Sequence, residues 1–319
     1  MDTRIIRRGG LLLLAASLTA ASAAADGSAD LKGSWSLNNW TAGASVHLTM
    51  KHASGSSRWA WSSDQLIVDL HGLTKEQLHA GNAPVTFTLS RDAGTFTFDG
   101  SVMLGLGRGE FRFAADPAFS GKLQALGYEA VPDKDLFAMA LRDISIAYAS
   151  EVMRSGIKGA TLGDLVRFRD HGVELDVIRD FASIGYANLR PDDVIRLRDH
   201  GVETELLRTL KAAGMGDLAA SEVIELSDHG VDAGYIEGLQ DSGRGKLSAD
   251  EIVKLKDHGI DPGFIKGLLS ARRGLTDVDD IIRLREHGVD PDYVARIESA
   301  GFTGLSVDQI IRLREHGID

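Results

Sequence analysis

From residue 171 onward, a tripeptide of histidine, glycine and either valine or isoleucine returns every 29 positions in this chain of 319 residues. The residues around it agree as well, since 191–202 matches 278–289 in its order of acidic, apolar and basic residues. Self-similarity at a fixed period is typical of solenoids, in which each repeat packs against its neighbours. The sequence therefore predicts an α-helical hairpin solenoid over 157–319, with six copies of which the last is a half repeat. The copies are anchored at His171, His200, His229, His258, His287 and His316.

Each copy predicts two short helices. In the first, apolar residues such as Val194, Ile195 and Leu197 recur at helical spacing with charged residues between them. The second begins at an N-cap followed by proline in Asp261-Pro262. Glycine after each histidine ends a helix at least cost in the left-handed conformation. These glycines are Gly172, Gly201, Gly230, Gly259, Gly288 and Gly317.

We interpret the repeated histidines as structural anchors in the last turn of the first helices. There they favour the helix dipole and can hydrogen-bond locally to the acidic residue beside them. A role in pH sensing and a role in metal binding are the alternatives. Metal binding is disfavoured because equal places in stacked repeats lie about a helix-pair width apart. The neighbouring acidic residues are Asp170, Asp199, Asp228, Asp257, Glu286 and Glu315.

In residues 26–116 the apolar residues recur at the two-residue spacing of strands rather than at helical spacing. Val85, Phe87 and Leu89 alternate with polar residues, which predicts strands of a small antiparallel β domain. Asp99-Gly100 predicts a hairpin turn. The glycines at 105, 107 and 109 lead into a strand, so we expect a turn there rather than a phosphate-binding loop. The predicted fold class is α+β with several domains.

The remaining segments flank these domains. Residues 1–25 contain three arginines, a short leucine-rich run and then small residues, which predicts a cleavable signal peptide. Residues 117–156 are expected to form a linker helix and a degenerate capping repeat. The chain has no cysteine, so it contains no disulfide and no lipid-anchored cysteine. We expect a periplasmic or secreted protein without stable membrane insertion.

The charge excludes some partners. The formal net charge is −11, and removal of the three arginines and Asp2 of the signal peptide changes it to −13. A protein with this acidic net charge repels nucleic acid.

No catalytic motif of the zinc-hydrolase, serine or cysteine type is present, which predicts a protein that is not an enzyme and has no cofactor. The loop 241–251 has a lysine where a calcium-binding loop needs its glycine, so we do not expect calcium binding there.

Two sets of motifs resemble a known family. Val-Ile-Arg-Leu-Arg-Asp-His-Gly-Val at 194–202 and the segment 290–302 resemble repeats of exported bacterial proteins, which also occur behind the membrane domain of β-lactam-sensor-type zinc peptidases. The segments 84–87, 91–96 and 107–113 resemble the β segment that precedes such repeats. The peptidase part is absent here. The resemblance implies a companion or regulatory protein without the enzyme, with a role in envelope sensing.

The solenoid surface is the first candidate for function, because stacked repeats create extended surfaces for a protein or peptide partner. Exposed positions that vary between copies are expected to carry specificity. The alternative is a cell-envelope glycan-binding protein that acts through Trp59 and Trp61 of the β domain, because aromatic rings stack on sugars. An enzyme with an unrecognised site is the third possibility. The candidate binding residues of the solenoid are Glu203, Glu205, Arg208, Asp232, Gly234 and Glu237.

Overall fold

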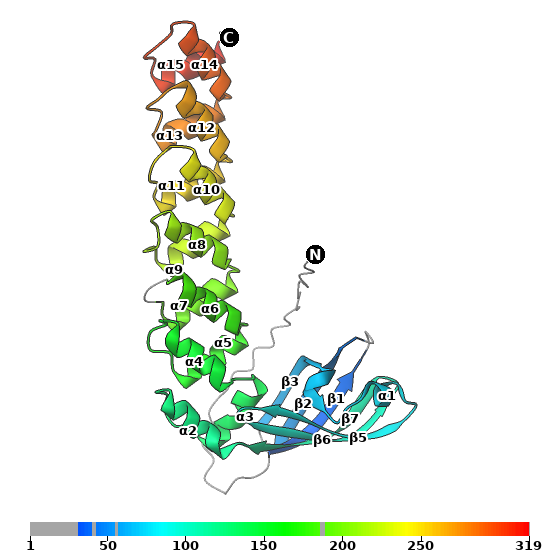
Figure 1. The fold of residues 1–319 in the computed structure, drawn as a ribbon. Helices are drawn as coiled ribbons and strands as arrows, with labels where there is room; N and C mark the ends of the chain where they lie inside the picture. Colours follow the sequence, from blue (N-terminus) through cyan, green and yellow to red (C-terminus); the bar gives the residue numbers. More distant parts are fainter. Residues whose placement is uncertain (1–30, 40–42, 55–56, 186–188, 319) are drawn as a thin grey trace. The chain divides into compact units, whose positions relative to one another are not determined.

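A computed structural model describes residues 31–39, 43–54, 57–185 and 189–318. It shows an antiparallel seven-stranded sheet followed by helices in a repeated arrangement, which confirms the predicted α+β fold class (Figure 1). The chain divides into two compact units. One comprises the described residues up to Ser120 with Pro132–Asp143, and the other comprises Gly121–Val131 with the described residues from Ile144 onward. The predicted signal peptide lies outside the described residues.

The sheet unit consists of two meanders. Strands β1 to β3 form one and β4 to β7 form the other, and the two join where β7 pairs with β1. The full order is β3-β2-β1-β7-β6-β5-β4, with every neighbouring pair antiparallel. The strands are β1 (Leu31–Asn38), β2 (Ser45–Ser54), β3 (Ser57–Leu66), β4 (Leu70–His71), β5 (Ala83–Arg91), β6 (Gly94–Met103) and β7 (Leu106–Ala115).

The two edge strands are joined by only three residues, the 3₁₀ helix Ile67–Asp69 between β3 and β4. In a flat sheet of seven strands the edges would be roughly 29 Å apart, since neighbouring strands are separated by about 4.8 Å. Four residue steps span at most about 14 Å. The short connection therefore requires the sheet to curl, and Figure 1 shows the strands curling around their own interior.

Trp35 packs on the inner face of the sheet beside three glycines. Its side chain is 3% exposed, and Nε1 donates a hydrogen bond to the Asp99 carbonyl oxygen at 3.1 Å. A Cβ placed at Gly100, Gly107 or Gly109 would lie within 2.9 Å of an atom of the indole ring. At Gly100 and Gly109, which face each other across β6 and β7, a Cβ would also lie 2.2 and 2.0 Å from a backbone carbonyl oxygen of the paired strand. The glycines thus allow close approach both of Trp35 and of the neighbouring backbone.

Two turn predictions change as a result. The hairpin predicted at Asp99-Gly100 is wrong, because both residues lie within β6. The turn predicted over 105–109 is shorter, since only Leu104 and Gly105 separate β6 from β7. In both places glycine is needed for close packing, which a sequence pattern cannot distinguish from a need for a turn.

Two helices complete the sheet unit. Helix α1 (Lys75–His79) starts with a capping box formed by Thr74 and Gln77. Helix α3 (Asp133–Leu141) packs on β6 and β7. The ring centroid of its Phe137 lies 4.8 Å from that of Trp59 in β3. The degenerate capping repeat predicted at the end of 117–156 corresponds to α3 and to the next helix, Ile146–Arg154, and these two helices belong to different compact units.

The helical unit has two layers of helices, one for each half of the repeat (Figure 1). Successive first helices contact one another, and so do successive second helices. Helix α2 (Pro117–Ala125) precedes them. The first helices are α5 (Leu162–Asp170), α7 (Pro191–Asp199), α9 (Ala220–Asp228), α11 (Ala249–Asp257), α13 (Val278–Glu286) and α15 (Val307–Glu315). The second helices are α4 (Ile146–Arg154), α6 (Leu175–Ile184), α8 (Thr204–Ala212), α10 (Ala233–Asp241), α12 (Pro262–Ala271) and α14 (Pro291–Ser299).

The predicted helix ends are confirmed. Ser248 and Ser306 form capping boxes, and the Asp261 side chain accepts a hydrogen bond from the Phe264 backbone N–H. The glycine after each histidine has a positive φ, for example 68° at Gly201. Because L-residues with a side chain adopt this conformation at a cost, glycine stops each first helix and turns the chain into the second helix.

The core lies between the two layers. The residue six positions before each histidine, such as Val194 or Ile281, is at most 2% exposed. A matching column on the second helices is equally buried: Ile178, Leu207, Ile236, Ile265 and Val294. Because helices of successive repeats contact one another, burial of these columns depends on the stacking of repeats.

Candidate binding surface of the helical repeats

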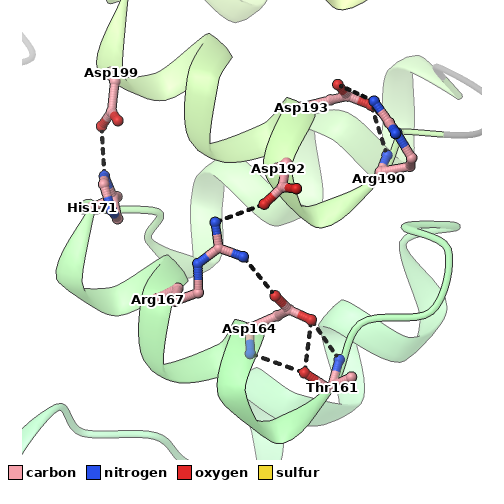
Figure 2. Close-up of polar contacts among 8 residues, drawn as sticks. All are labelled: Thr161, Asp164, Arg167, His171, Arg190, Asp192, Asp193 and Asp199. Carbon is pink, nitrogen blue, oxygen red and sulfur yellow. Dashed lines mark hydrogen bonds and ion pairs between the residues drawn. The ribbon is translucent and has the colours of Figure 1, made fainter. Parts of the chain in front are cut away.

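The histidines form a ladder that joins consecutive repeats. Nδ1 of each of the first five histidines lies 2.7 to 3.1 Å from a carboxylate oxygen of the next repeat. Each carboxylate stands 28 positions further along the chain than its histidine. The pairs of this histidine ladder are His171–Asp199, His200–Asp228, His229–Asp257, His258–Glu286 and His287–Glu315. The first of them is drawn in Figure 2.

This arrangement corrects the expected local hydrogen bond. Each histidine is the C-cap residue of its first helix, so its place at the helix end is as predicted. Its carboxylate partner, however, belongs to the next copy rather than to the preceding residue. Adjacent residues on a helix point in different directions, whereas equal positions of stacked helices lie side by side. The sequence contained a clue, because an acidic residue stands 28 positions after each of these five histidines.

The pairs of the histidine ladder lie at the protein surface. A hydrogen bond with Asp257 is the largest cause that raises the pKa of the His229 imidazole above its ordinary value. Both side chains of this pair are more than a third exposed, so solvent screens their interaction. Among the described residues, no group of three or more His, Asp or Glu side chains could hold a metal ion.

A second array of charge pairs lies on the same first helices, and the sequence analysis missed it. We call each of these contacts a junction pair. It joins the residue four positions before one repeated histidine to the residue eight positions before the next repeated histidine. In the first junction, Arg167 donates a hydrogen bond to Asp192 at 2.6 Å and also holds Asp164 of its own helix (Figure 2). Lys254–Asp279 and Arg283–Asp308 repeat this contact later in the array. Opposite charges 25 positions apart were the available signal.

Junction pairs are broken on both sides of α9. Arg196 of α7 stands opposite Ser221, where the other junctions have aspartate, and Glu225 of α9 stands at the cationic position opposite Asp250. Arg196 and Ser221 both line a cavity of about 470 Å³ between the second and third repeats. Helix α9 thus interrupts an otherwise regular charge pattern.

Buried tyrosines stabilise the junctions from the inside. Tyr148, Tyr235 and Tyr293 each donate a hydroxyl hydrogen bond of 2.6 to 2.7 Å to the backbone carbonyl 25 positions later. A cation covers each ring, and the Lys256 Nζ lies 4.4 Å from the ring centroid of Tyr235. Burial raises the pKa of Tyr235 to about 12, which keeps the hydroxyl a neutral donor.

The residues predicted to bind a partner lie on two neighbouring second helices. Glu205 and Arg208 are exposed on α8, where they form an ion pair, and Glu237 is exposed on α10. Helices α8 and α10 contact each other, so the structure brings these positions onto one face. Two further candidates occupy N-cap positions: Glu203 precedes α8, and Asp232 accepts the Tyr235 backbone N–H at 2.8 Å. Asp232 therefore stabilises a helix whatever else it does.

On the sheet, Trp59 and Trp61 lie on one face of the edge strand β3, as expected, and both are half-buried. Trp59 stacks on His52 and packs against Phe137, so much of its ring is already covered. The other histidines of the sheet unit do not converge on them: His47 pairs with Asp64, and His79 Nδ1 lies 2.6 Å from the Lys75 carbonyl oxygen.

Among the described residues, no helix has the length and apolar character that a membrane crossing requires. No protein-family model and no curated protein matches this chain.

Proposed function

We propose that this chain is an exported, non-enzymatic binding protein whose helical-repeat surface recognises a protein or peptide partner, as part of envelope sensing or regulation. Export rests on the signal-peptide pattern of residues 1–25. The observation that carries the binding function is the contrast between two columns on the second helices. The core column at Ile178, Leu207, Ile236, Ile265 and Val294 is apolar in every repeat.

The next residue in each helix behaves differently. Arg179, Arg208, Glu237 and Lys266 are exposed, and Ala295 continues the column, so this face carries positive, negative and uncharged residues in different repeats. Folding constrains the first column, because its side chains fill the core. The side chains of the second column are exposed, and surface ion pairs such as Arg208 with Glu205 contribute little to folding. This column can therefore match the charges of a partner.

The experiment is in-cell crosslinking of the tagged full-length chain followed by mass spectrometry. A double variant, Arg208→Glu with Glu237→Lys, reverses the column at two adjacent repeats without changing the net charge. The matched control, Lys51→Glu with Glu110→Lys, makes the same exchange on exposed residues of the sheet unit. We expect one protein to be captured by the wild type and the control but not by the double variant. Equal capture by all three would reject the solenoid surface as the binding site.

Glycan binding through the sheet is the second candidate, and Trp61 carries it. This side chain is half-exposed on an edge strand, where a ring can stack on a sugar. The packing of Trp59 against Phe137 reduces the aromatic surface that this function could use. Retention of the wild type, but not of Trp61→Ala, on purified peptidoglycan or polysaccharide would favour it.

A further inference from the structure

The junction pairs predict the charge pattern of the partner. Where the positions are occupied by opposite charges, they bind each other: Arg167 with Asp192, Lys254 with Asp279, and Arg283 with Asp308. Every one of these cations is held by a carboxylate of the following repeat. The array itself thus shows which group belongs opposite each position.

The junction between α7 and α9 lacks its anion. Ser221 replaces the aspartate, and no ion pair or hydrogen bond joins the Arg196 guanidinium to another residue that the structure describes. The other two cations lining this cavity are engaged: Arg190 pairs with Asp193 at 3.2 Å, and Lys211 donates to the Ile184 carbonyl. Arg196 also interacts electrostatically with Asp193, but that carboxylate is bound directly by Arg190. Arg196 is therefore the cation of this cavity whose guanidinium has no hydrogen bond among the described residues and can bind a ligand.

The junction between α9 and α11 lacks its cation. Glu225 and Asp250 are both exposed carboxylates at positions that hold a cation and an anion elsewhere. Two like charges at neighbouring positions repel each other, so a basic group placed between them is favoured. The two incomplete junctions lie on opposite sides of the same helix, and their missing charges are opposite in sign.

We infer that the partner is a peptide segment that presents a carboxylate to Arg196 and a basic group to Glu225 and Asp250. The partner's carboxylate takes the place that Asp192 takes opposite Arg167, and its basic group takes the place of Lys254 or Arg283. This inference rests on the proposed function and specifies the ligand of that surface.

The helix spacing sets the spacing of the two charges. Packed helices lie about 8 to 10 Å apart, so the two incomplete junctions are separated by one such step. An extended chain covers this distance in roughly three residues. The segment recognised is therefore an acidic group and a lysine or arginine roughly three residues apart in an extended conformation.

The test uses the full-length chain and random dodecapeptides, displayed once with free C-termini and once with blocked C-termini. Enriched peptides are then synthesised and their affinities are measured by fluorescence anisotropy. Comparison of the two libraries distinguishes a C-terminal carboxylate from an acidic side chain. Ser221→Asp restores the missing anion, and Glu225→Lys restores the missing cation. Thr303→Asp is the matched control for Ser221→Asp, because it adds the same charge in an exposed loop.

We expect enriched peptides to carry the acidic and basic pair, and each restoring variant to bind them roughly fivefold to tenfold more weakly than wild type and control. Both variants complete a charge pair, so their melting temperatures should not fall, and weaker binding cannot be explained by unfolding. Peptides that bind wild type and both variants equally would overturn this inference while the proposed function stands. Recovery of no peptide, together with no partner in the crosslinking experiment, would reject both.

Discussion

The hydroxyl of Tyr235 offers the sharpest test of how the repeats hold together. The residue is 8% exposed, and its hydroxyl donates to the Ile260 carbonyl of the next repeat at 2.7 Å. Tyr235→Phe keeps the ring and its contact with Lys256, so only the hydrogen bond is lost. A buried carbonyl left without its donor costs about 1 to 2 kcal/mol.

In a stacked array this cost is local, because each repeat interacts only with its neighbours. The assay is therefore hydrogen–deuterium exchange, resolved to peptides, on the full-length chain. Amides of α10 to α12 should exchange about fivefold to thirtyfold faster in Tyr235→Phe, while those of α4 should be unchanged. An unchanged rate in α10 to α12 would refute the role of the hydroxyl. Equal acceleration throughout the array would refute the nearest-neighbour description.

The chain supplies a reciprocal control at the next repeat. Phe264 occupies the equivalent position there, and the Arg285 guanidinium lies 5.1 Å from its ring centroid. Phe264→Tyr would place a hydroxyl near the Val289 carbonyl, which corresponds to that of Ile260. We expect it to stabilise this junction by about 0.5 to 1 kcal/mol and to slow exchange in α12 to α14. Destabilisation would show that the geometry at Tyr235 does not transfer along the column.

Four further substitutions test other parts of the structure. His229→Gln should remove the part of the pH dependence of the free energy of unfolding that comes from this imidazole. The pKa of the imidazole is raised in the folded state above the unfolded value of about 6.5. The stability that this histidine contributes is therefore complete below about pH 6.5 and is lost as the pH rises through the folded pKa. Urea unfolding at several pH values measures the free energy of unfolding of both proteins, and identical pH profiles would argue against this contribution. Gly201→Ala, at φ 68° with open space around it, should cost about 1 kcal/mol of backbone strain by thermal unfolding, and an unchanged transition would show that no strain exists. Gly107→Ala should disrupt the sheet, because the new Cβ would lie 2.8 Å from Trp35 Cζ3; an unaltered tryptophan fluorescence spectrum would contradict this. Ile281→Ala, at a fully buried site, should cost about 2 to 5 kcal/mol in urea unfolding, and a loss below about 1 kcal/mol would mean that the core at this position collapses around the cavity.

Local patterns determined much of the helical unit. The glycine after each histidine, the serine and aspartate caps and the apolar spacing act within a few residues of one another, so the sequence alone predicted where helices start and stop. The same local logic failed at Asp99-Gly100. There the glycine is explained by two neighbours that tertiary structure brings close, the backbone of the paired strand at Arg108 and Gly109 and the indole ring of Trp35. The residues directly around Gly100 do not contain that information.

The charge pairs between repeats were missed for a related reason, because the 28- and 25-residue spacings indicate contacts only once the helices are known to stack. His171 and Asp170 are neighbours in sequence but point in different directions, whereas His171 and Asp199 meet because their helices stack. The interruption at Arg196 and Ser221 can likewise be recognised only once the junction pairs are known.

The period of the repeat, the helical hairpins and the antiparallel strands were therefore determined by the sequence, because local hydrogen bonding and apolar spacing specify them. The curl of the sheet, the packing of α3 on it, the histidine ladder and the incomplete junctions beside α9 were decided by the tertiary structure. They depend on which distant residues become neighbours, and packing brings those residues together.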